Sequence, residues 1–240
     1  MQCFFPSRYT AEVGDVVVGC IEELSGKRWK VALKAAQEAV LHLSAVNLPG
    51  GVQRRRTWED ELNMRNVYGE GDYICAEVQS IHGDGSVALH TRSSKYGKLK
   101  EGQLVRVPTH LIKKRKQNFV KVEEAGVTAV LGCNGYIWVC SPASLPSDGP
   151  KDDEDDDLDD PMETSGAVGA AEAGPELFAN LCIVANVIRA LGALQLPITS
   201  EAITQGVALA RDDSVPLNRI GEKDFMKQLV VYESIRRTQD

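Results

Sequence analysis

The 240-residue sequence lacks the features of a secreted protein, a membrane protein or a cysteine-rich zinc module. No apolar run reaches the ~18–20 residues that are needed to span a bilayer. The first residues, MQCFFPSRYTAEVGD, lack a basic region followed by an apolar one, so no secretory signal is evident. Six cysteines are present, but none forms a C-x-x-C pair, and without an export signal they are expected to be reduced thiols.

Catalytic and metal-binding motifs are also missing. The sequence contains no phosphate-binding G-x-x-x-x-G-K-[ST] loop, no H-E-x-x-H, no G-x-S-x-G and no EF-hand loop. The four histidines have no helical i, i+4 pair and no closely spaced cysteine, which argues against a metal site. A free-standing exonuclease would need metal-binding carboxylates on the folded body, whereas the dense cluster here lies in a polar loop. We therefore predict a binding protein with no enzymatic activity, cofactor, metal or small-molecule substrate.

The formal net charge of -7 conceals a segregation of charges. Residues 151–164 hold nine acids and one lysine, whereas residues 52–121 hold fourteen Lys and Arg against eight Asp and Glu. The chain is thus a locally basic body with one acidic insert. Like charges at this density repel each other and cannot be buried, so we predict a disordered loop over about 142–175.

The first part of the chain is rich in strand signals. Five short strands are expected, with a short helix between the third and the fourth that runs from residue 58 to about 66. This element order is typical of an OB-type β-barrel. The predicted strands cover residues 15–22, 28–33, 39–43, 73–81 and 86–91.

The second part predicts an α/β domain. Strand-like runs at 127–131 and 136–140 flank Gly132-Cys133-Asn134-Gly135, whose Asn-Gly pair favours a tight hairpin. Helices are expected after the acidic loop, over 176–194, 199–210 and 222–237. Because the hairpin lacks a helical partner on its own side of the loop, we expect the loop to interrupt one domain. The predicted organisation is a tail (1–9), a barrel (10–103) and an interrupted domain (104–240).

Basic residues are interleaved with aromatic residues along the predicted barrel. Cationic groups match a phosphate backbone and an aromatic face can stack a base, so such a barrel is a platform for single-stranded nucleic acid. The triplet Arg54, Arg55 and Arg56 is a further candidate contact for RNA or protein. The candidate RNA-binding residues are Lys27, Arg28, Trp29, Lys30, His42, Arg92, Lys95, Tyr96 and Lys98.

Each of these signals has a structural alternative. Trp29 shares a strand face with Val31 and Leu33, so it could be a core residue. His42 could be an exposed polar position without a ligand, and the arginine triplet could be a solvated face or a protein-docking patch. The run at 111–116, LIKKRK, resembles a nuclear localisation cluster, although short basic runs are common by chance.

Three stretches resemble the eukaryotic RNA exosome cap subunit family known as ribosomal RNA-processing protein 4: LHLSAVNLPGG, RRRTWEDELNMR and VALHTRSSKYGKL. The resemblance starts at Glu12 and continues through GVTAVLGCNGYIWV, which is similar to the KH domain of that family. It implies an S-one-type barrel of the OB class followed by a KH-like domain. In barrels of this type an aromatic residue, a histidine and a basic residue build the RNA face, and these patterns fall on Trp29, His42 and Arg92.

The resemblance also implies a function. Members are non-catalytic subunits that bind single-stranded RNA, contact RNase PH-like ring subunits and other cap subunits, and have no membrane partner. They guide RNA into the ring channel for 3′-to-5′ processing and decay, including rRNA processing and mRNA turnover, and they stabilise the ring. The implied location is the nucleus and nucleolus, and also the cytoplasm. The alternative is a protein-interaction scaffold whose barrel contacts ring subunits without binding RNA.

The sequence departs from the family at three places. The β-rich N-terminal domain of the family is expected to be missing, because Met1 lies only about ten residues before the barrel. The loop Gly132-Cys133-Asn134-Gly135 offers no cation, unlike many RNA-clamping KH loops, so we expect it to be structural. The acidic run Asp152–Asp160 would repel RNA. It is expected to face away from the channel or to meet a basic protein partner, and the alternative is that it has no specific role.

Overall fold

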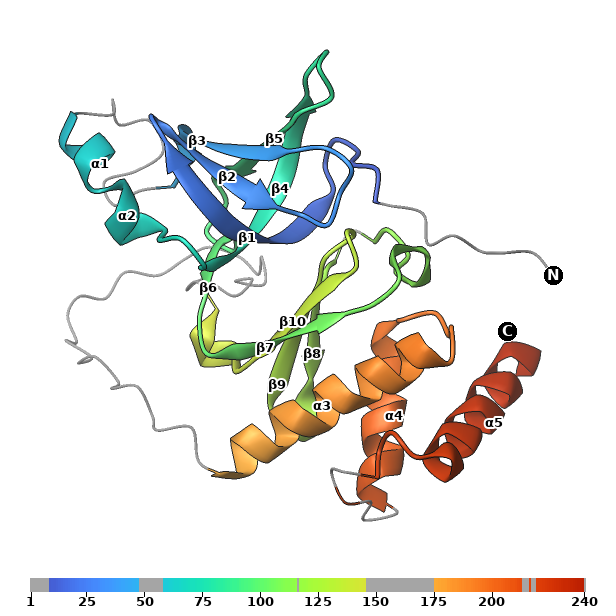
Figure 1. Cartoon of the computed structure of the whole chain (residues 1–240). Coiled ribbons are helices and arrows are strands. Elements are labelled where there is room, and N and C mark those ends of the chain that lie inside the picture. The colour runs from blue at the N-terminus through green and yellow to red at the C-terminus, as the bar shows by residue number, and fades with distance from the viewer. Residues whose placement is uncertain are drawn as a thin grey trace, which may run out of the picture.

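The computed structural model describes residues 9–47, 58–115, 117–145, 175–212, 216 and 219–239. In this part the chain forms a six-stranded sheet, a four-stranded sheet and three longer helices, which pack as one body (Figure 1). The acidic run and the arginine triplet lie outside the described residues.

The first sheet closes into a barrel. Its order is β1-β2-β3-β5-β4-β6, and an additional antiparallel pairing of β1 with β4 closes it. All five predicted strands are present, so the expected OB-type barrel is confirmed. The short β6, which the sequence analysis missed, pairs antiparallel with the start of β4. The strands are β1 (Val16–Ser25), β2 (Arg28–Ala32), β3 (Ala39–Val46), β4 (Tyr73–Ile81), β5 (Val87–Thr91) and β6 (Gly97–Leu99), with α1 (Trp58–Leu62) and α2 (Met64–Val67) between β3 and β4.

Strand alternation fills the barrel. Trp29 and Val31 on β2 point inward, as does Leu41 on β3, while the residues between them face outward. Tyr9 belongs to this core too: it is buried, forms a bridge with Ala35, and its hydroxyl donates to Asp15 Oδ2 at 2.6 Å. Tyr9 is therefore part of the barrel rather than of the predicted tail.

The second sheet is antiparallel, with the order β7-β10-β9-β8. The expected hairpin is formed by β9 and β10, and the three expected helices are present. The chain passes from the first sheet to the second between Leu99 and Gly102, slightly before the predicted boundary at 103. The elements are β7 (Gly102–Arg106), β8 (Phe119–Val122), β9 (Val127–Leu131), β10 (Tyr136–Cys140), α3 (Pro175–Ala193), α4 (Ser200–Asp212) and α5 (Lys223–Gln239).

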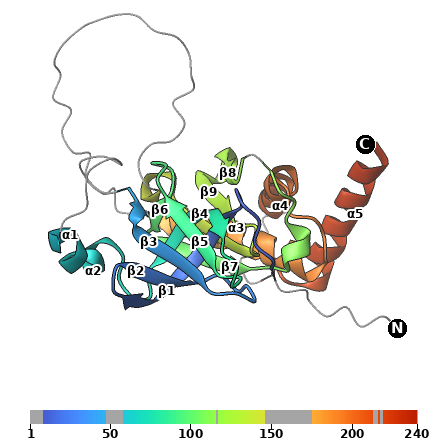
Figure 2. The ribbon, with the colours of Figure 1, turned by 90° about the horizontal axis from the view of Figure 1, so that it is seen from above.

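The second sheet is buried on both faces. On β10, Ile137 and Val139 point into the core made with the helices, whereas Trp138 and Cys140 point into the contact with the barrel. The Trp138 ring lies 5.1 Å from that of Tyr73 on β4, centroid to centroid. Figure 1 shows the helices on one side of this sheet and the barrel on the other, and Figure 2, seen from above, shows α4 and α5 beside the barrel strands. Because strands before residue 146 and helices after residue 174 share one core, the segment between them interrupts a single domain.

Helix α3 is apolar over a longer stretch than we expected from the sequence, in which no apolar run of membrane-spanning length was evident. Its residues Glu176–Ala193 have the length and the mean hydropathy, 1.4, of a membrane span. Val184, Ile188 and Leu191, spaced three and four residues apart, are completely buried against the second sheet and α4. Packing inside the domain therefore accounts for the apolar composition of this helix.

The described cysteines, which are Cys20, Cys75, Cys133, Cys140 and Cys182, are not paired in disulfides. Burial raises the pKa of Cys75 and raises that of Cys140 to about 12, because an apolar environment disfavours the thiolate. Both thiols lie where the barrel meets the second sheet, so they act there as small apolar side chains.

The side chain of Asn134 joins the two domains. It is completely buried at the tip of the β9–β10 hairpin. Its amide nitrogen donates to the carbonyl oxygens of Val18 and Leu33, both at 2.8 Å, and its oxygen accepts from the Val18 N–H at 3.3 Å. The neighbouring Cys133 N–H donates to the Val16 carbonyl at 2.9 Å. The hairpin tip thus supplies hydrogen-bond partners to backbone groups of the barrel that do not pair with another strand.

We predict that Asn134→Ala lowers the free energy of unfolding by about 2–4 kcal/mol, because it leaves buried carbonyl groups without donors. Urea denaturation followed by circular dichroism measures this loss. Asn134→Asp keeps the size of the side chain but removes the donors and buries a charge, so it should be at least as damaging at neutral pH. Exposed Asn66→Ala is the control, and a loss as small as that of the control would contradict the prediction.

Candidate nucleic-acid interface

Trp29 is a core residue, so the expectation that it stacks an RNA base is wrong for this structure. Its side chain has no exposed area, and its indole N–H donates to the Tyr68 carbonyl at 2.9 Å. The Trp29 and Tyr68 rings meet edge to face, with centroids 5.3 Å apart. The pattern of Trp29, Val31 and Leu33 on one face was the correct signal, because all three side chains point into the barrel.

Tyr96 is also buried, and it packs between the barrel and the second sheet. Burial raises the pKa of its phenol strongly, and a hydrogen bond to Glu77 acts in the same direction. The Tyr96 and His90 rings meet edge to face, with centroids 6.4 Å apart, and His90 Nε2 lies 4.0 Å from Glu77 Oε1. Tyr96 therefore packs in the contact between the barrel and the second sheet, and its ring is not exposed for stacking on an RNA base.

Arg28 and His42 lie side by side on the outer face of the barrel. They are partners in the antiparallel register of β2 and β3, and both side chains are exposed. Directly opposed residues in such a pair have Cβ atoms about 4.5–5.5 Å apart. Neither side chain forms an ion pair with a described residue. The structure thus places a guanidinium and an imidazole together where both are accessible to a ligand.

Three of the other predicted lysines already have carboxylate partners. Lys27 Nζ lies 2.5 Å from Glu61 on α1, and Lys30 Nζ lies 2.6 Å from Glu38. Lys98 Nζ lies 2.5 Å from Asp72 in a partly buried pair. Exposed pairs such as those of Lys27 and Lys30 contribute little stability, so a phosphate can displace the carboxylate.

For the third pair, burial alone would raise the pKa of Asp72. The hydrogen bonds from Lys98 and from the Gly69 N–H, together with the Lys98 charge, outweigh it and lower that pKa. The more deeply placed Lys98 is therefore committed to Asp72, and it is the weakest RNA candidate of the three.

Arg92 and Lys95 are exposed in the turn after β5. Thr91 pairs with Val46 in the parallel β3–β5 ladder, so Arg92 lies near the end of β3. His42 precedes Val46 by four residues, or about 13 Å along the strand. Lys95 Nζ lies 5.5 Å from the centroid of the Tyr96 ring, which holds the turn against the barrel. The candidate cations therefore extend from β2 and β3 to the turn after β5, along the direction of β3, rather than meeting at one point.

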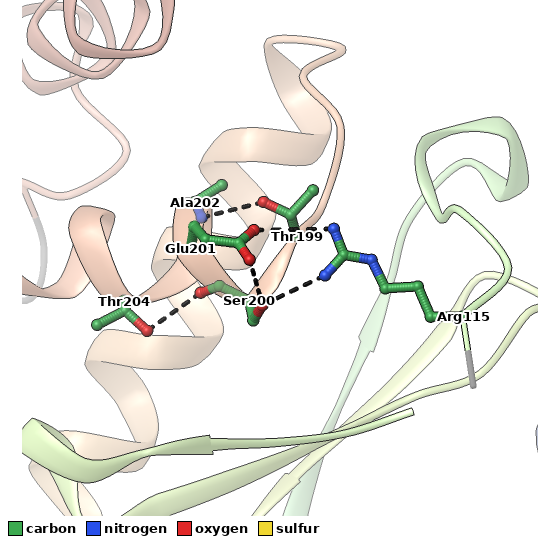
Figure 3. Close-up of polar contacts among 6 residues, drawn as sticks. All are labelled: Arg115, Thr199, Ser200, Glu201, Ala202 and Thr204. Carbon is green, nitrogen blue, oxygen red and sulfur yellow. Dashed lines mark hydrogen bonds and ion pairs between the residues drawn. The ribbon is translucent and has the colours of Figure 1, made fainter. Parts of the chain in front are cut away.

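Two described cations of the basic run at 111–116, Lys114 and Arg115, make structural contacts. Lys114 pairs with Glu12 and with Asp15, the latter at 3.1 Å. Arg115 reaches the start of α4, where its guanidinium donates to Ser200 Oγ at 3.3 Å and lies 3.7 Å from Glu201 (Figure 3). The same helix start is capped by Thr199 Oγ1, which accepts from the Ala202 N–H at 3.1 Å. Two cations of this run thus tie the connecting segment to the barrel and to α4.

The loop Gly132-Cys133-Asn134-Gly135 is structural, as its lack of a cation suggested. Cys133 and Asn134 are buried against the barrel, and a side chain at Gly132 would lie 2.9 Å from the Val18 backbone. The loop therefore has no exposed surface with which to clamp RNA. The candidate contacts Arg54, Arg55 and Arg56 lie outside the described residues.

One cationic group was missed by the sequence analysis. Lys34 Nζ and the Arg106 guanidinium carbon lie 6.0 Å and 5.5 Å from the centroid of the Tyr136 ring. Lys34 follows β2 of the barrel, whereas Arg106 and Tyr136 belong to the second sheet. No local pattern joins residues so far apart in the chain. We call Lys34, Arg106 and Tyr136 the seam group.

Comparison with known proteins places this geometry in a family. A model described as the S1 domain of RRP4 matches residues 8–80, and a KH domain model matches residues 102–145. The exosome complex component RRP4 homolog of Arabidopsis thaliana is 40% identical over 233 residues, which cover 96% of this chain and 71% of that protein. The chain belongs to the RRP4 family of exosome complex components. This confirms the family named from the three sequence stretches.

Other RRP4 proteins are also similar to this chain. Exosome complex component RRP4 of Saccharomyces cerevisiae is 39% identical over 237 residues, covering 90% of this chain and 65% of that protein. RRP4 of Bos taurus is 53% identical over 133 residues, covering 55% of this chain and 45% of that protein. The chain thus spans only part of its RRP4 relatives. A crystal structure assigned to an exosome complex RNA-binding protein shares the fold, with a TM-score of 0.52 at 17% identity, over 87% of this chain and 99% of that one.

We predict that Trp29→Phe lowers the free energy of unfolding by about 1–3 kcal/mol, because it removes a buried hydrogen bond and some core volume. The affinity for single-stranded RNA, measured where the variant is fully folded, should stay within about twofold of wild type. Urea denaturation and fluorescence anisotropy give the two values. A large loss of RNA affinity in the folded variant would contradict this prediction and would indicate that Trp29 contacts RNA.

We also predict a pH effect from His90. Burial lowers the pKa of its imidazole, Glu77 opposes this, and Arg92 adds to the lowering. In the unfolded chain the pKa is ordinary, near 6.5. The unfolded state therefore binds more protons below that pH, and stability should fall as the pH drops from about 7 to about 5. In urea denaturation across this range, His90→Gln should lose less stability than wild type; an identical pH profile would contradict the assignment.

Proposed function

We propose that this chain is a non-catalytic RNA-binding cap subunit of the RNA exosome. It guides single-stranded RNA into the channel of an RNase PH-like ring for 3′-to-5′ processing and decay, including rRNA processing and mRNA turnover, and it stabilises the ring with the other cap subunits. Its place of action is the nucleus and nucleolus, and also the cytoplasm. Membership of the RRP4 family supports the assembly, and the S1 and KH domain matches support RNA as the ligand.

The observation that carries the RNA part is the exposed pair Arg28 and His42 on adjacent strands of an OB-type barrel. OB-type barrels hold nucleic acid on an outer sheet face through cations that track the backbone. Arg92 and Lys95 extend this face beyond the end of β3. Because Trp29 and Tyr96 are buried, the interaction has fewer stacking contacts than the sequence suggested. It depends more on phosphate contacts, which are insensitive to base sequence.

A protein-interaction scaffold is the second candidate, and burial of Trp29 is the observation that favours it. Exposed Trp58 and Leu62 on α1, at 67% and 71% exposure, also suit a protein contact better than an RNA contact. The first turn of α1 carries Glu59, Asp60 and Glu61, whose charges repel phosphate. The two candidates differ in one measurable property, which is affinity for RNA in the absence of any protein partner.

We predict that Arg92→Ala combined with Lys95→Ala weakens RNA binding to a similar degree for all RNA sequences. Loss of two phosphate contacts should reduce the slope of log K against log salt by about 1.4. Fluorescence anisotropy with labelled oligouridylate and oligoadenylate over a salt series measures both effects. The control is Lys121→Ala with Lys223→Ala, two exposed cations on β8 and α5. Unchanged affinity and an unchanged salt slope would show that the turn after β5 does not contact RNA.

A further inference from the structure

The seam group brings two cations from different domains to one aromatic ring. Asn134 donates to the Leu33 carbonyl, which fixes the backbone directly before Lys34. Lys34 itself has φ 57°, a left-handed conformation that is uncommon for a residue with a side chain. On the other side, Arg106 and Tyr136 are register partners on β7 and β10. The contact between the domains therefore sets the position of both cations.

The two cations of the seam group are not paired with a described carboxylate. Lys34 and Arg106 are exposed, and within the described ranges neither forms an ion pair with a carboxylate. In contrast, Lys27, Lys30 and Lys114 each have an acidic partner. A cation–π contact orients a cation without neutralising it, so both groups remain able to attract an anion.

The seam group continues the cationic face of the barrel. Along β2, Arg28 and Lys30 point outward and alternate with buried residues. Lys34 lies two residues beyond the end of β2, directly after buried Leu33, and its side chain is exposed. The four residue steps of β2 from Arg28 to Ala32 span about 13 Å. An RNA strand lying along the outer face of β2 would pass the end of this strand and meet Lys34, and then Arg106, at the border with the second sheet.

We propose that the seam group is a second binding site for the phosphodiester backbone of single-stranded RNA. Lys34 and Arg106 contact phosphates, and Tyr136 holds the two cations in place between the domains. This inference rests on the proposed function, because the strand reaches the seam group from the barrel face. It gives the KH-like domain an RNA contact through β7 and β10, although its Gly132–Gly135 loop is buried.

The test measures RNA length dependence with the full chain. Labelled oligouridylates of about 4 and about 16 nucleotides bracket the site sizes of OB-type barrels. Lys34→Ala with Arg106→Ala should weaken binding of the longer RNA roughly tenfold at about 0.1 M salt and reduce its salt slope by about 1.4. Binding of the shorter RNA, which the barrel face accommodates alone, should stay near the wild-type value. The charge-matched control is again Lys121→Ala with Lys223→Ala.

Two further variants separate charge from folding. Lys34→Arg with Arg106→Lys keeps both charges and should retain most of the affinity for the longer RNA. Arg28→Ala with His42→Ala removes the barrel contacts and should weaken both RNA lengths. Thermal unfolding of each variant tests whether the two domains remain folded together.

The outcomes distinguish the two proposals. If the barrel variant weakens binding and the seam variant matches the control on both RNA lengths, the seam inference is overturned while the proposed function stands. If the wild-type chain binds neither RNA, the proposed function and the seam inference both fail. A seam defect confined to the longer RNA, restored by the charge-keeping variant, supports the inference.

Discussion

The buried amide of Asn134 is the contact on which the arrangement of the two domains depends. It satisfies backbone groups of Val18 and Leu33 that no strand partner reaches, and it does so from a hairpin more than a hundred residues further along the chain. Tight packing of Trp138 and Cys140 against β1 and β4 completes the border. A loop that in other KH domains clamps RNA thus serves here as the joint between a barrel and a sheet.

This joint explains how the second sheet can be apolar on both faces. Helices α3 and α4 cover one face and the barrel covers the other, so neither domain leaves a large apolar surface in water. The same joint fixes which cations are accessible. Lys114 and Arg115 form ion pairs with Asp15 and Glu201 and so fix the connecting segment. Arg28, His42 and the cations of the seam group are exposed. The cations that hold the domains together are therefore different from those to which we assign RNA contacts.

Much of the fold could be predicted because strand alternation and turn residues are local signals. The five barrel strands, the hairpin at Gly132–Gly135 and the three helices follow from such patterns. The site was harder to predict because a pattern does not say which side of a strand faces the core. Trp29 matched an RNA-binding pattern and a core pattern equally well, and burial decided for the core. The ion pairs of Lys27 and Lys98, and the meeting of Lys34 with Arg106, join residues far apart in the chain and leave no local trace.

On both proposals, RNA runs along the outer face of the barrel toward the second sheet. The most direct measurement is photo-crosslinking of the full chain to 4-thiouridine-containing RNA, with the attached peptides identified by mass spectrometry. The account predicts adducts on peptides from β2 and β3, on the turn after β5, and on the peptides that carry Lys34 and Tyr136. Adducts confined to helices α3–α5, or no adducts on the barrel, would contradict it.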